Sequence, residues 1–327
     1  MSQPVLSVRD LIVEIPTRNA VLRPVDRVSY DIAPGEILGV VGEIGAGKSM
    51  TGNAVIGLLD RPARITGGEI LLKGKRIDNL RYEQMRRLRG KEIGMVFQDP
   101  LTSLNGVIPI GDQLAETMLE HLGVTRAEAD RRAIAALEEV GIPAARERVD
   151  SYPHEFSGGM RQRVVIALAL CAEPSLVIAD EPTTALDVSV QAQIIALLKR
   201  LCRERGTAVM LVTHDMGVIA EAADRVAVIY AGRLAELGPV RDVLTEPRHP
   251  YTDGLMGSTP LASQGKARLH QIPGAMPRLG ALPPGCAFHP RCPKVADKCR
   301  IDPSPMLDTC DGRAACWFPI TTREAAE

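Results

Sequence analysis

The sequence is poor in aromatic residues, in net charge and in long apolar runs. Aromatic residues make up 3% of its 327 residues, and the formal net charge at pH 7 is -1. So few aromatic side chains argue against a stacking platform for single-stranded nucleic acid, and a near-neutral chain has no basic excess to attract nucleic acid or an acidic membrane. The most apolar helix-like run, Val164 to Ala172, lies between Arg163 and Glu173 and is far too short to span a bilayer. We therefore expect no nucleic-acid partner, and any membrane role must come through other proteins.

Residues 1–15 lack the features of a secretory leader. No charged segment precedes a long apolar core there, and no small-residue cleavage site follows. We therefore expect a cytosolic chain. No internal repeat or low-complexity tract is present, and the 45% of hydrophobic residues suffices for a substantial core. The length fits one large domain with an appendage, or two domains.

A glycine-rich stretch from Gly42 to Ser49 has the chemistry of a phosphate-binding loop. It lies between an apolar run at 36–41, which predicts a buried strand, and residues 50–59, which predict a helix. Its spaced glycines let successive N–H groups point at phosphate oxygens, and the helix N-terminus adds its positive dipole. Lys48 can reach the β- and γ-phosphates, and the Ser49 hydroxyl can ligate Mg²⁺. The alternative, a glycine-rich turn that binds nothing, is disfavoured by the complete pattern in this context.

The remaining patterns predict an α/β fold around this loop. Strand-like residues at 6–15 and 68–77, with turn signals nearby, predict an antiparallel sheet beside the strand of the loop. Apolar residues at three- and four-residue spacing in 110–122 and 126–140 predict an inserted helical lobe. The alternation of strands and helices predicts a mostly parallel sheet with helices on both faces. The expected strands are 93–97, 176–179, 208–212 and 226–230, and the expected helices are 164–170 and 190–205.

Two carboxylates follow the apolar strand at 176–179. Of Asp180 and Glu181, one can hold Mg²⁺ through its waters, and the other can polarise an attacking water. The alternative is a pair of solvated acids that cap a strand. The presence of Lys48 and Ser49 in the same chain favours the catalytic interpretation.

Three further features gain meaning from their order in the chain. Gln98 ends its own strand and could ligate Mg²⁺ or orient water, while His214 follows another strand and could hydrogen-bond a γ-phosphate. Each alone is a weak signal, because a lone histidine is more often structural. The stretch Ser157-Gly158-Gly159 can cap the helix that follows and bring its backbone close to an anion. Because the first loop already holds one triphosphate, a second such helix end suggests a surface that completes the site of another subunit.

Taken in order, these motifs resemble those of ATP-binding-cassette (ABC) ATPases. The series contains the phosphate loop, Gln98, the Ser-Gly-Gly signature at Ser157, Asp180-Glu181, Ala185-Leu186-Asp187 and His214. It covers roughly the first three quarters of the chain, up to residue 245. The resemblance implies an ATPase in which two subunits or domains stack head to tail. Each ATP, with Mg²⁺, then lies between the phosphate loop of one and the signature of the other.

By position, the resemblance implies a role for each site residue. Glu181 corresponds to the general base and His214 to the γ-phosphate switch, and Gln98 belongs to the loop that senses the transporter. Ser49, Gln98 and Asp180 correspond to Mg²⁺ partners. The residues expected to contact ATP are Gly42, Glu43, Ile44, Gly45, Ala46, Gly47, Lys48, Ser49, Met50, Gln98, Ser157, Gly158, Gly159 and, in the cross-interface loop, Asp187.

Other stretches resemble the ATPases of oligopeptide, dipeptide and nickel importers, namely 98–105, 152–155, 181–188, 249–252 and 272–274. The resemblance then covers nearly the whole chain. It implies a peripheral subunit on the cytoplasmic face of the bacterial inner membrane that energises import of di- or oligopeptides or a related solute. The implied partners are two integral-membrane permeases, a second and related ATPase subunit, and an extracytoplasmic solute-binding protein. The alternative, a soluble ABC ATPase acting on nucleic acid or ribosomes, usually has two cassettes or a long coiled-coil insertion, and neither is present.

Three features depart from the usual ABC pattern. Phe156 and Met160 replace the usual Leu before and Gln after the signature glycines, but Met160 is familiar in the peptide-importer branch, so we expect activity to persist. No aromatic residue for stacking on adenine occurs at 19–22, so adenine is expected to rest on aliphatic side chains. Ile44 replaces a small polar residue, with little consequence expected because its backbone N–H is unaffected.

The seven cysteines are unevenly placed. Cys171 and Cys202 lie alone in apolar or helical settings and are expected to be core residues. The others crowd into the C-terminal segment, where thiolates close in sequence can clamp a metal centre that replaces a hydrophobic core. A cytosolic chain disfavours permanent disulfides. The four candidate ligands are Cys286, Cys292, Cys299 and Cys316, separated by five, six and sixteen residues.

This spacing does not fit the paired Cys-x-x-Cys of a zinc ribbon. It resembles the C-terminal segment of dipeptide and oligopeptide importer ATPases, some of which carry a [4Fe-4S] cluster on four such cysteines. That cluster is therefore the expected one, with Zn²⁺ or unligated thiols as alternatives. Cys310 could replace Cys316 as the fourth ligand, and His289 could also ligate but is expected to be structural.

The expected architecture is an α/β P-loop NTPase of ABC type. It has a mostly parallel sheet, an antiparallel β subdomain and an inserted helical subdomain at about 100–160. Loss of periodicity from about Pro247 onward places the ABC ATPase domain at 1–246 and a Cys/Pro-rich extension at 247–327.

Overall fold

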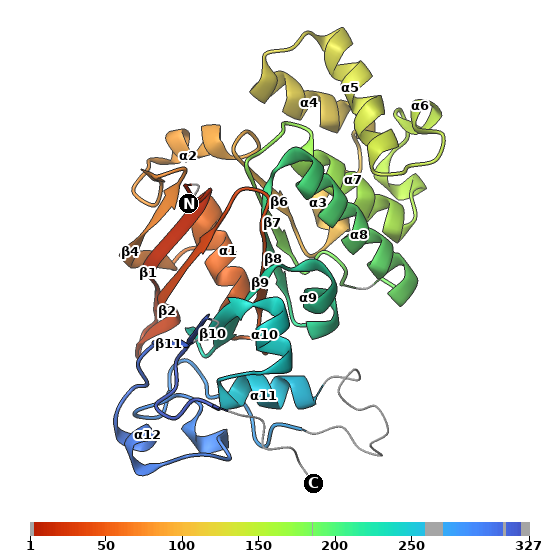
Figure 1. Ribbon diagram of the computed structural model, residues 1–327. Helices are drawn as coiled ribbons and strands as arrows, with labels where there is room; N and C mark the ends of the chain where they lie inside the picture. The colour runs from red at the N-terminus through yellow and green to blue at the C-terminus, as the bar shows by residue number, and fades with distance from the viewer. Residues whose placement is uncertain (1–2, 185, 259–270, 310–311, 322–327) are drawn as a thin grey trace. The chain divides into compact units, whose positions relative to one another are not determined.

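The computed structural model describes residues 3–184, 186–258, 271–309 and 312–321 (Figure 1). The chain divides into two compact units. Unit 1 comprises Met1–Leu6, Ile32–Ile37 and Asn79–Leu211, and unit 2 comprises Ser7–Asp31, Leu38–Asp78 and Val212–Glu327. No helix among the described residues is long and apolar enough to cross a membrane.

Unit 2 carries the glycine-rich loop and two groups of strands. A four-stranded sheet has the order β2-β1-β4-β5, formed by β1 (Leu6–Pro16), β2 (Val21–Ile32), β4 (Arg64–Leu72) and β5 (Lys75–Arg76). The second group has the order β11-β12-β10-β9-β3, formed by β3 (Ile37–Val41), β9 (Arg225–Tyr230), β10 (Arg233–Pro239), β11 (Leu307–Thr309) and β12 (Gly312–Ala314). β3 and β9 are parallel, whereas β9, β10, β12 and β11 pair antiparallel.

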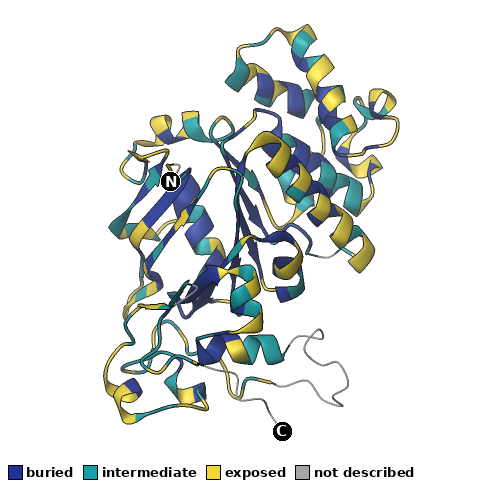
Figure 2. Cartoon of the chain, viewed as in Figure 1, coloured by how far each residue is buried: buried dark blue, intermediate teal, exposed yellow. Residues whose placement is uncertain are grey.

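Burial explains why the parallel strands have continuous apolar sequences. All five residues of β3 are buried, and so are five of the six residues of β9 (Figure 2). Strands covered on both faces need apolar residues at every position rather than at alternate ones. The strand-like stretch expected at 68–77, with its turn signal at Lys73-Gly74-Lys75, forms the β4–β5 hairpin. Lys73 and Gly74 adopt φ angles of 49° and 75°, and two successive positive φ angles close a tight two-residue turn.

Unit 1 contains the parallel pair β6 (Ile93–Val96) and β7 (Leu176–Asp180), in which Ile93 lies opposite Leu176. β8 (Ala208–Thr213) begins beside β7, where the Ala208 N–H donates to the Ser175 carbonyl at 2.9 Å. The predicted helical lobe is present as α4 (Ile110–Leu122) and α5 (Arg126–Glu139). The other helices of this unit are α2 (Tyr82–Leu88), α3 (Pro100–Ser103), α6 (Ala145–Arg148), α7 (Gly158–Leu170) and α8 (Val188–Arg205).

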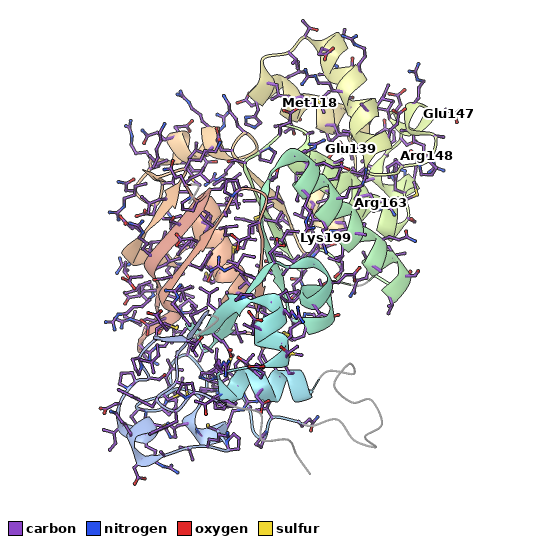
Figure 3. All side chains as sticks on the ribbon, viewed as in Figure 1. Met118, Glu139, Glu147, Arg148, Arg163 and Lys199 are labelled. Carbon is purple, nitrogen blue, oxygen red and sulfur yellow. The ribbon has the colours of Figure 1, made fainter. Side chains whose placement is uncertain are left out.

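Arginine side chains connect helices of unit 1 through hydrogen bonds. Arg163 and Arg148, labelled in Figure 3, both make such contacts. Arg163 on α7 donates from Nη1 to the Val140 carbonyl at 2.7 Å and from Nη2 to Gln193 Oε1 at 2.9 Å. Arg148 on α6 donates to the sulfur of Met160 at 3.9 Å. The signature helix α7 is thereby joined to the ends of α5 and α6 and to α8.

The C-terminal region is not only loops, because it contributes strands to the sheet of unit 2. β12 pairs with β10, with Ala314 opposite Glu236, and β11 adds to β12. The remaining helices of unit 2 are α1 (Lys48–Ile56), α9 (Met216–Ala222), α10 (Val240–Thr245), α11 (Pro250–Gly257) and α12 (Asp297–Ile301). The division into domains at 246/247 remains a prediction, since the compact units follow other boundaries.

Candidate functional site

The glycine-rich loop of unit 2 joins buried β3 to α1 and has the shape that its sequence predicts. Gly42 has φ +157° and Gly47, the N-cap of α1, has φ +104°. A Cβ atom on Gly42 would lie 2.2 Å from the Ile229 carbonyl oxygen, and one on Gly47 would lie 2.1 Å from that of Pro24. Only glycine fits at these two points, so the loop can curl tightly between β3 and the helix.

Lys48 lies on the inner side of this curl. Its side chain is 5% exposed, and Nζ donates to the carbonyls of Gly42 at 2.8 Å and Glu43 at 3.1 Å. The loop is also tied to the β9–β10 turn, where the Gly232 N–H donates to the Ala46 carbonyl at 2.8 Å. A buried ammonium group at the start of a helix, beside a tightly curled glycine-rich loop, is suited to hold a polyphosphate.

His214 belongs to the same unit as this loop. It follows Thr213, the last residue of β8, and its side chain is exposed. Asp215 accepts a hydrogen bond from the Gly217 N–H at 2.7 Å and caps α9, which fixes the backbone just after the histidine.

Unit 1 brings the predicted general base together with Gln98. Asp180 ends β7 and is 8% exposed, and Glu181 follows it with φ +46°. Glu181 Oε2 accepts hydrogen bonds from Thr184 Oγ1 at 3.0 Å and from Gln98 Nε2 at 3.4 Å. A non-glycine residue in the left-handed region is strained, and such strain concentrates at functional positions. Two neighbouring side chains thus hold the Glu181 carboxylate in place.

Two further predicted site residues of unit 1, Ser157 of the signature and Asp187, are each exposed at the start of a helix. Ser157 caps α7 by accepting from the Met160 N–H at 3.4 Å, and Asp187 caps α8 by accepting from the Val190 N–H at 2.9 Å. The Val190 hydrogen bond, followed by one from Ser189, lowers the pKa of Asp187. Phe156, which replaces the usual Leu, is 2% exposed and packs as an apolar anchor before the signature. Ala185, in the expected series, lies outside the described residues.

Four cysteines line one small cavity in the C-terminal region. Cys286, Cys292, Cys299 and Cys316 all border it, together with His289 and Trp317. The Cys286 N–H donates to the Cys299 carbonyl at 2.8 Å, which joins two of the segments. β12 pairs with β10 just before Cys316, and this pairing brings the fourth cysteine to the cavity. Cys310 lies outside the described residues.

The thiols influence one another electrostatically. Burial raises the pKa of Cys316 to about 11, and Cys286, Cys292 and Cys299 add to the rise. Burial, and then the neighbouring Cys286 and Cys299, also raise the pKa of Cys292. Among the described residues, no three His, Cys, Asp or Glu side chains are arranged to hold a single metal ion.

The two isolated cysteines behave as the sequence predicts. Cys171 and Cys202 are buried, and burial raises the pKa of each to about 12. Such thiols are inert core residues.

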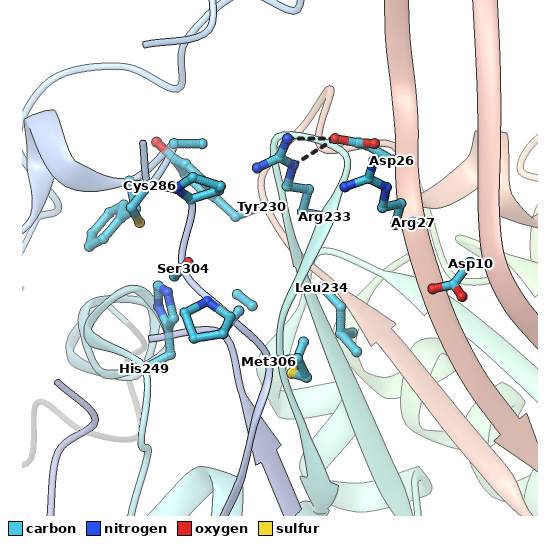
Figure 4. Close-up of a pocket in the computed structure, with 16 residues that line it drawn as sticks. Asp10, Asp26, Arg27, Tyr230, Arg233, Leu234, His249, Cys286, Ser304 and Met306 are labelled. Carbon is cyan, nitrogen blue, oxygen red and sulfur yellow. Dashed lines mark hydrogen bonds and ion pairs between the residues drawn. The ribbon is translucent and has the colours of Figure 1, made fainter. Parts of the chain in front are cut away.

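A wider cavity of about 410 Å³ lies next to Cys286 in unit 2 (Figure 4). Tyr230 and His249 face it, and the ion pair between Arg233 and Asp26, at 2.6 Å, forms part of its wall. The sequence analysis did not anticipate this cavity, since its walls come from segments far apart in the chain.

Sequence reasoning also missed Arg291. Its Nη1 donates to Glu43 Oε1, within the glycine-rich loop, at 2.8 Å. The residues are 248 positions apart. The only signal in the sequence is that Arg291 precedes Cys292 by one residue.

Comparison with known proteins identifies the family. A family model described as ABC transporter matches residues 25–184, and one described as Oligopeptide/dipeptide transporter, C-terminal region, matches residues 235–299. The chain is 46% identical over 326 residues to the dipeptide transport ATP-binding protein DppD of Bacillus subtilis, which covers 99% of this chain and 97% of that protein. It is 47% identical over 316 residues to the oligopeptide transport ATP-binding protein OppD of Salmonella typhimurium, with 96% and 94% covered. The chain belongs to the ABC transporter family. Since that family consists of ATPases, it is an ATPase.

Solved ABC cassettes confirm the predicted fold class. A dimeric ATP-binding cassette, solved in a post-hydrolysis state with ADP and Pi, has a TM-score of 0.65 at 26% identity and covers 72% of this chain and 99% of that chain. The cassette cbiO1 from Clostridium perfringens has a TM-score of 0.64 at 28% identity and covers 75% of this chain and 92% of that chain. The ABC fold, with its phosphate-binding loop, mixed sheet, antiparallel sheet and helical elements, is therefore shown. The Cys/Pro-rich extension as a separate part of the ABC chain remains a prediction.

Proposed function

We propose that this chain is the ATP-hydrolysing subunit of a bacterial importer for di- or oligopeptides or a related solute. The observation that carries the proposal is similarity along nearly the whole chain to DppD and OppD, including the C-terminal region at 235–299. The subunit would lie at the cytoplasmic face of the inner membrane. Its partners would be two permease subunits, a related second ATPase and an extracytoplasmic solute-binding protein.

Within this proposal, each site residue has the role that the resemblance to ABC ATPases implies. Lys48 binds the β- and γ-phosphates, and the amides of residues 42–49 bind the remaining phosphate oxygens. Mg²⁺ would supply charge neutralisation between the phosphates, and the hydroxyl of Ser49 and the carboxylate of Asp180 are the oxygen donors that this ion prefers. Gln98 and His214 complete the set, Gln98 at the water and His214 at the γ-phosphate.

Glu181 is the proposed general base. Its carboxylate accepts from Thr184 and Gln98, and these two hydrogen bonds orient the side chain. A fixed carboxylate can take the proton of the attacking water without first reorganising.

The signature at 157–159 is proposed to serve the ATP of a second subunit. Ser157 and Gly158 are exposed at the start of α7, and Asp187 is exposed at the start of α8. Helix starts of this kind attract the phosphates of a nucleotide held elsewhere. One relative of known structure is a dimeric cassette, which supports this arrangement.

The function is tested by solute uptake in vesicles that contain the permeases, both ATPases and the binding protein. Glu181→Gln is expected to abolish ATP turnover and uptake and to preserve ATP binding, because the amide cannot accept the proton. Glu204→Gln is the matched control, since Glu204 lies exposed on α8 in a surface ion pair at 3.9 Å that contributes little. Uptake that persists in Glu181→Gln would contradict the assigned base. If the wild-type assembly takes up no peptide when ATP is supplied, the proposed function is contradicted.

We also propose that the four-cysteine cavity holds a [4Fe-4S] cluster, with Zn²⁺ as the alternative. The proposal is supported by the four cysteines lining one cavity and by the resemblance of this segment to importer ATPases that carry such a cluster. The residues that would hold it are Cys286, Cys292, Cys299 and Cys316, and its role would be structural or redox sensing.

Anaerobic purification with iron, sulfide and zinc analysis tests this centre. We expect iron and sulfide in equal amounts, a visible absorbance band, and loss of both signals in Cys299→Ser. Cys171→Ala is the control, because Cys171 is a buried cysteine far along the chain from the cavity. A colourless protein with one zinc per chain would establish the alternative instead.

A further inference from the structure

Arg291 connects the cysteine-bearing segment to the phosphate-binding loop. Its side chain is only 6% exposed, and it is the residue just before Cys292. Nη1 donates to Glu43 Oε1 at 2.8 Å, and Nε donates to the Pro273 carbonyl at 2.9 Å. A charge buried to this degree requires a partner, and Glu43 provides it.

Glu43, the second residue of the loop, is held at three points. Its carboxylate accepts from Arg291, and its backbone N–H donates to Tyr251 Oη at 2.9 Å. Its carbonyl accepts from Lys48 Nζ at 3.1 Å. The same residue thus contacts the C-terminal region and the lysine that is proposed to bind phosphate. The orientation of the first peptide groups of the loop depends on contacts made from residues 251 and 291.

Aromatic side chains pack on one side of Arg291. Arg291 Nη1 also lies 3.3 Å from Tyr230 Oη, with the guanidinium 5.8 Å from the Tyr230 ring centre. Tyr230 packs against Tyr251 and Phe288 at ring distances of 4.5 and 5.2 Å. Figure 4 shows Tyr230 near Cys286. The Glu43 side chain is 29% exposed and borders an open cavity of about 480 Å³, so water reaches part of its carboxylate. Loss of Arg291 would nevertheless remove the one cation that contacts this carboxylate among the described ion pairs, and would leave a negative charge beside the loop.

We propose that Arg291 is a positioning residue for the nucleotide and that, through Glu43, the cysteine-bearing segment sets the ATP affinity of the loop. The inference rests on the proposed ATP site at 42–49. The pair acts in two ways: it cancels a negative charge beside the phosphates, and it holds the peptide groups that face them. Both effects are strong in a partly buried site, where charges are less screened than in water.

Binding of a fluorescent ATP analogue to the full chain tests the proposal. Arg291→Gln is expected to weaken binding about tenfold, equivalent to about 1.4 kcal/mol, because an unpaired carboxylate then repels the phosphates. Glu43→Gln should weaken it less than threefold, and the double variant should regain most of the affinity lost in Arg291→Gln. A purely structural defect would show no such rescue. In the assembled transporter, KM for ATP should rise in Arg291→Gln while kcat changes little.

Two controls separate the possible failures. Arg300→Gln alters an exposed arginine beside Cys299 and should bind like the wild type. Lys48→Ala should abolish binding, and wild-type binding by Lys48→Ala would show that the proposed ATP site is wrong. If Lys48→Ala fails to bind while Arg291→Gln binds like Arg300→Gln, or if the double variant shows no recovery, the coupling is overturned.

Should Arg291→Gln not fold, Arg291→Lys replaces it. This variant is expected to bind ATP within about threefold of wild type, since the charge is retained. A tenfold loss of affinity in Arg291→Lys would overturn the charge argument.

Discussion

At the scale of single residues, Glu181 combines chemistry with backbone strain. Its φ of +46° lies in the left-handed region, which costs a side-chain-bearing residue about 1 kcal/mol relative to glycine. Thr184 Oγ1 donates to its carboxylate at 3.0 Å and fixes the side chain in this backbone conformation. The protein therefore keeps a locally unfavourable residue where the proposed reaction requires a base.

This strain leads to a stability prediction. Glu181→Gly should unfold at higher urea than Glu181→Ala, by about 1 kcal/mol in free energy of unfolding, because both lose the carboxylate but only glycine relaxes the backbone. At Ala196, an exposed residue in the interior of α8, glycine should instead lower stability relative to alanine by a similar amount, because glycine disfavours a helix interior. Equal stabilities of the two Glu181 variants would show that the backbone is not strained.

At the scale of elements, His249 fixes the start of α11. Its Nδ1 accepts from the Tyr251 N–H at 3.0 Å, and its ring makes a backbone hydrogen bond with Ala315, next to β12. Burial lowers the pKa of His249 to about 4, with the Ala315 hydrogen bond acting in the opposite direction. A neutral histidine thus joins the helix to the segment that carries Cys316.

This histidine makes stability depend on pH. Between pH 6.5 and about 4 the unfolded chain binds a proton that folded His249 does not, so stability falls as pH falls, by about 3 kcal/mol. Glu236 contributes in the opposite direction, since burial raises its pKa, and a wild-type comparison is needed. His249→Asn keeps a capping oxygen and should lose this dependence, whereas His154→Asn, at an exposed position, should retain it. Denaturant unfolding at pH 7, 5.5 and 4 measures how the free energy of unfolding of each variant changes with pH. The same change in wild type and His249→Asn would contradict the role given to His249.

Elements with strong periodicity or continuous apolar runs were predictable, and others were not. Helix α4 was expected at 110–122 and is found at Ile110–Leu122, because its apolar residues repeat at helical spacing. β3 was expected from its apolar run, which follows from burial on both faces. β12 was missed, because it has only three residues and exists through pairing with β10. A strand that short has no periodicity of its own.

At the scale of the whole molecule, the phosphate-binding loop is proposed to be half of a site. The isolated chain should bind ATP through Lys48 but hydrolyse it slowly, since no signature from a second subunit is present. Adding the related ATPase and permeases should raise turnover. Ser157→Arg should leave ATP binding to the isolated chain unchanged and abolish the stimulated turnover, whereas Lys48→Ala should lose both. Rapid hydrolysis by a preparation shown to be monomeric by light scattering would refute this.

The candidate site was mostly predictable because its chemistry is encoded in short stretches. The loop at 42–49, the pair Asp180-Glu181 and the signature at 157–159 are local patterns in which spacing and residue type determine what the backbone can do. Family membership could be predicted from their order alone, and the comparisons confirmed it. A metal centre at the cysteines, like its identity, stays a prediction, since no local pattern separates the candidates.

The sequence by itself therefore determined the ABC family, the glycine-rich loop and the elements whose apolar residues repeat with their own period. Only the tertiary structure decided that Cys316 joins Cys286, Cys292 and Cys299 at one cavity, and that Arg291 pairs with Glu43. The physical reason is the same in both cases. Glycine conformations and helix periodicity act between neighbours in the chain, whereas a buried ion pair between residues 248 positions apart depends on which surfaces pack together.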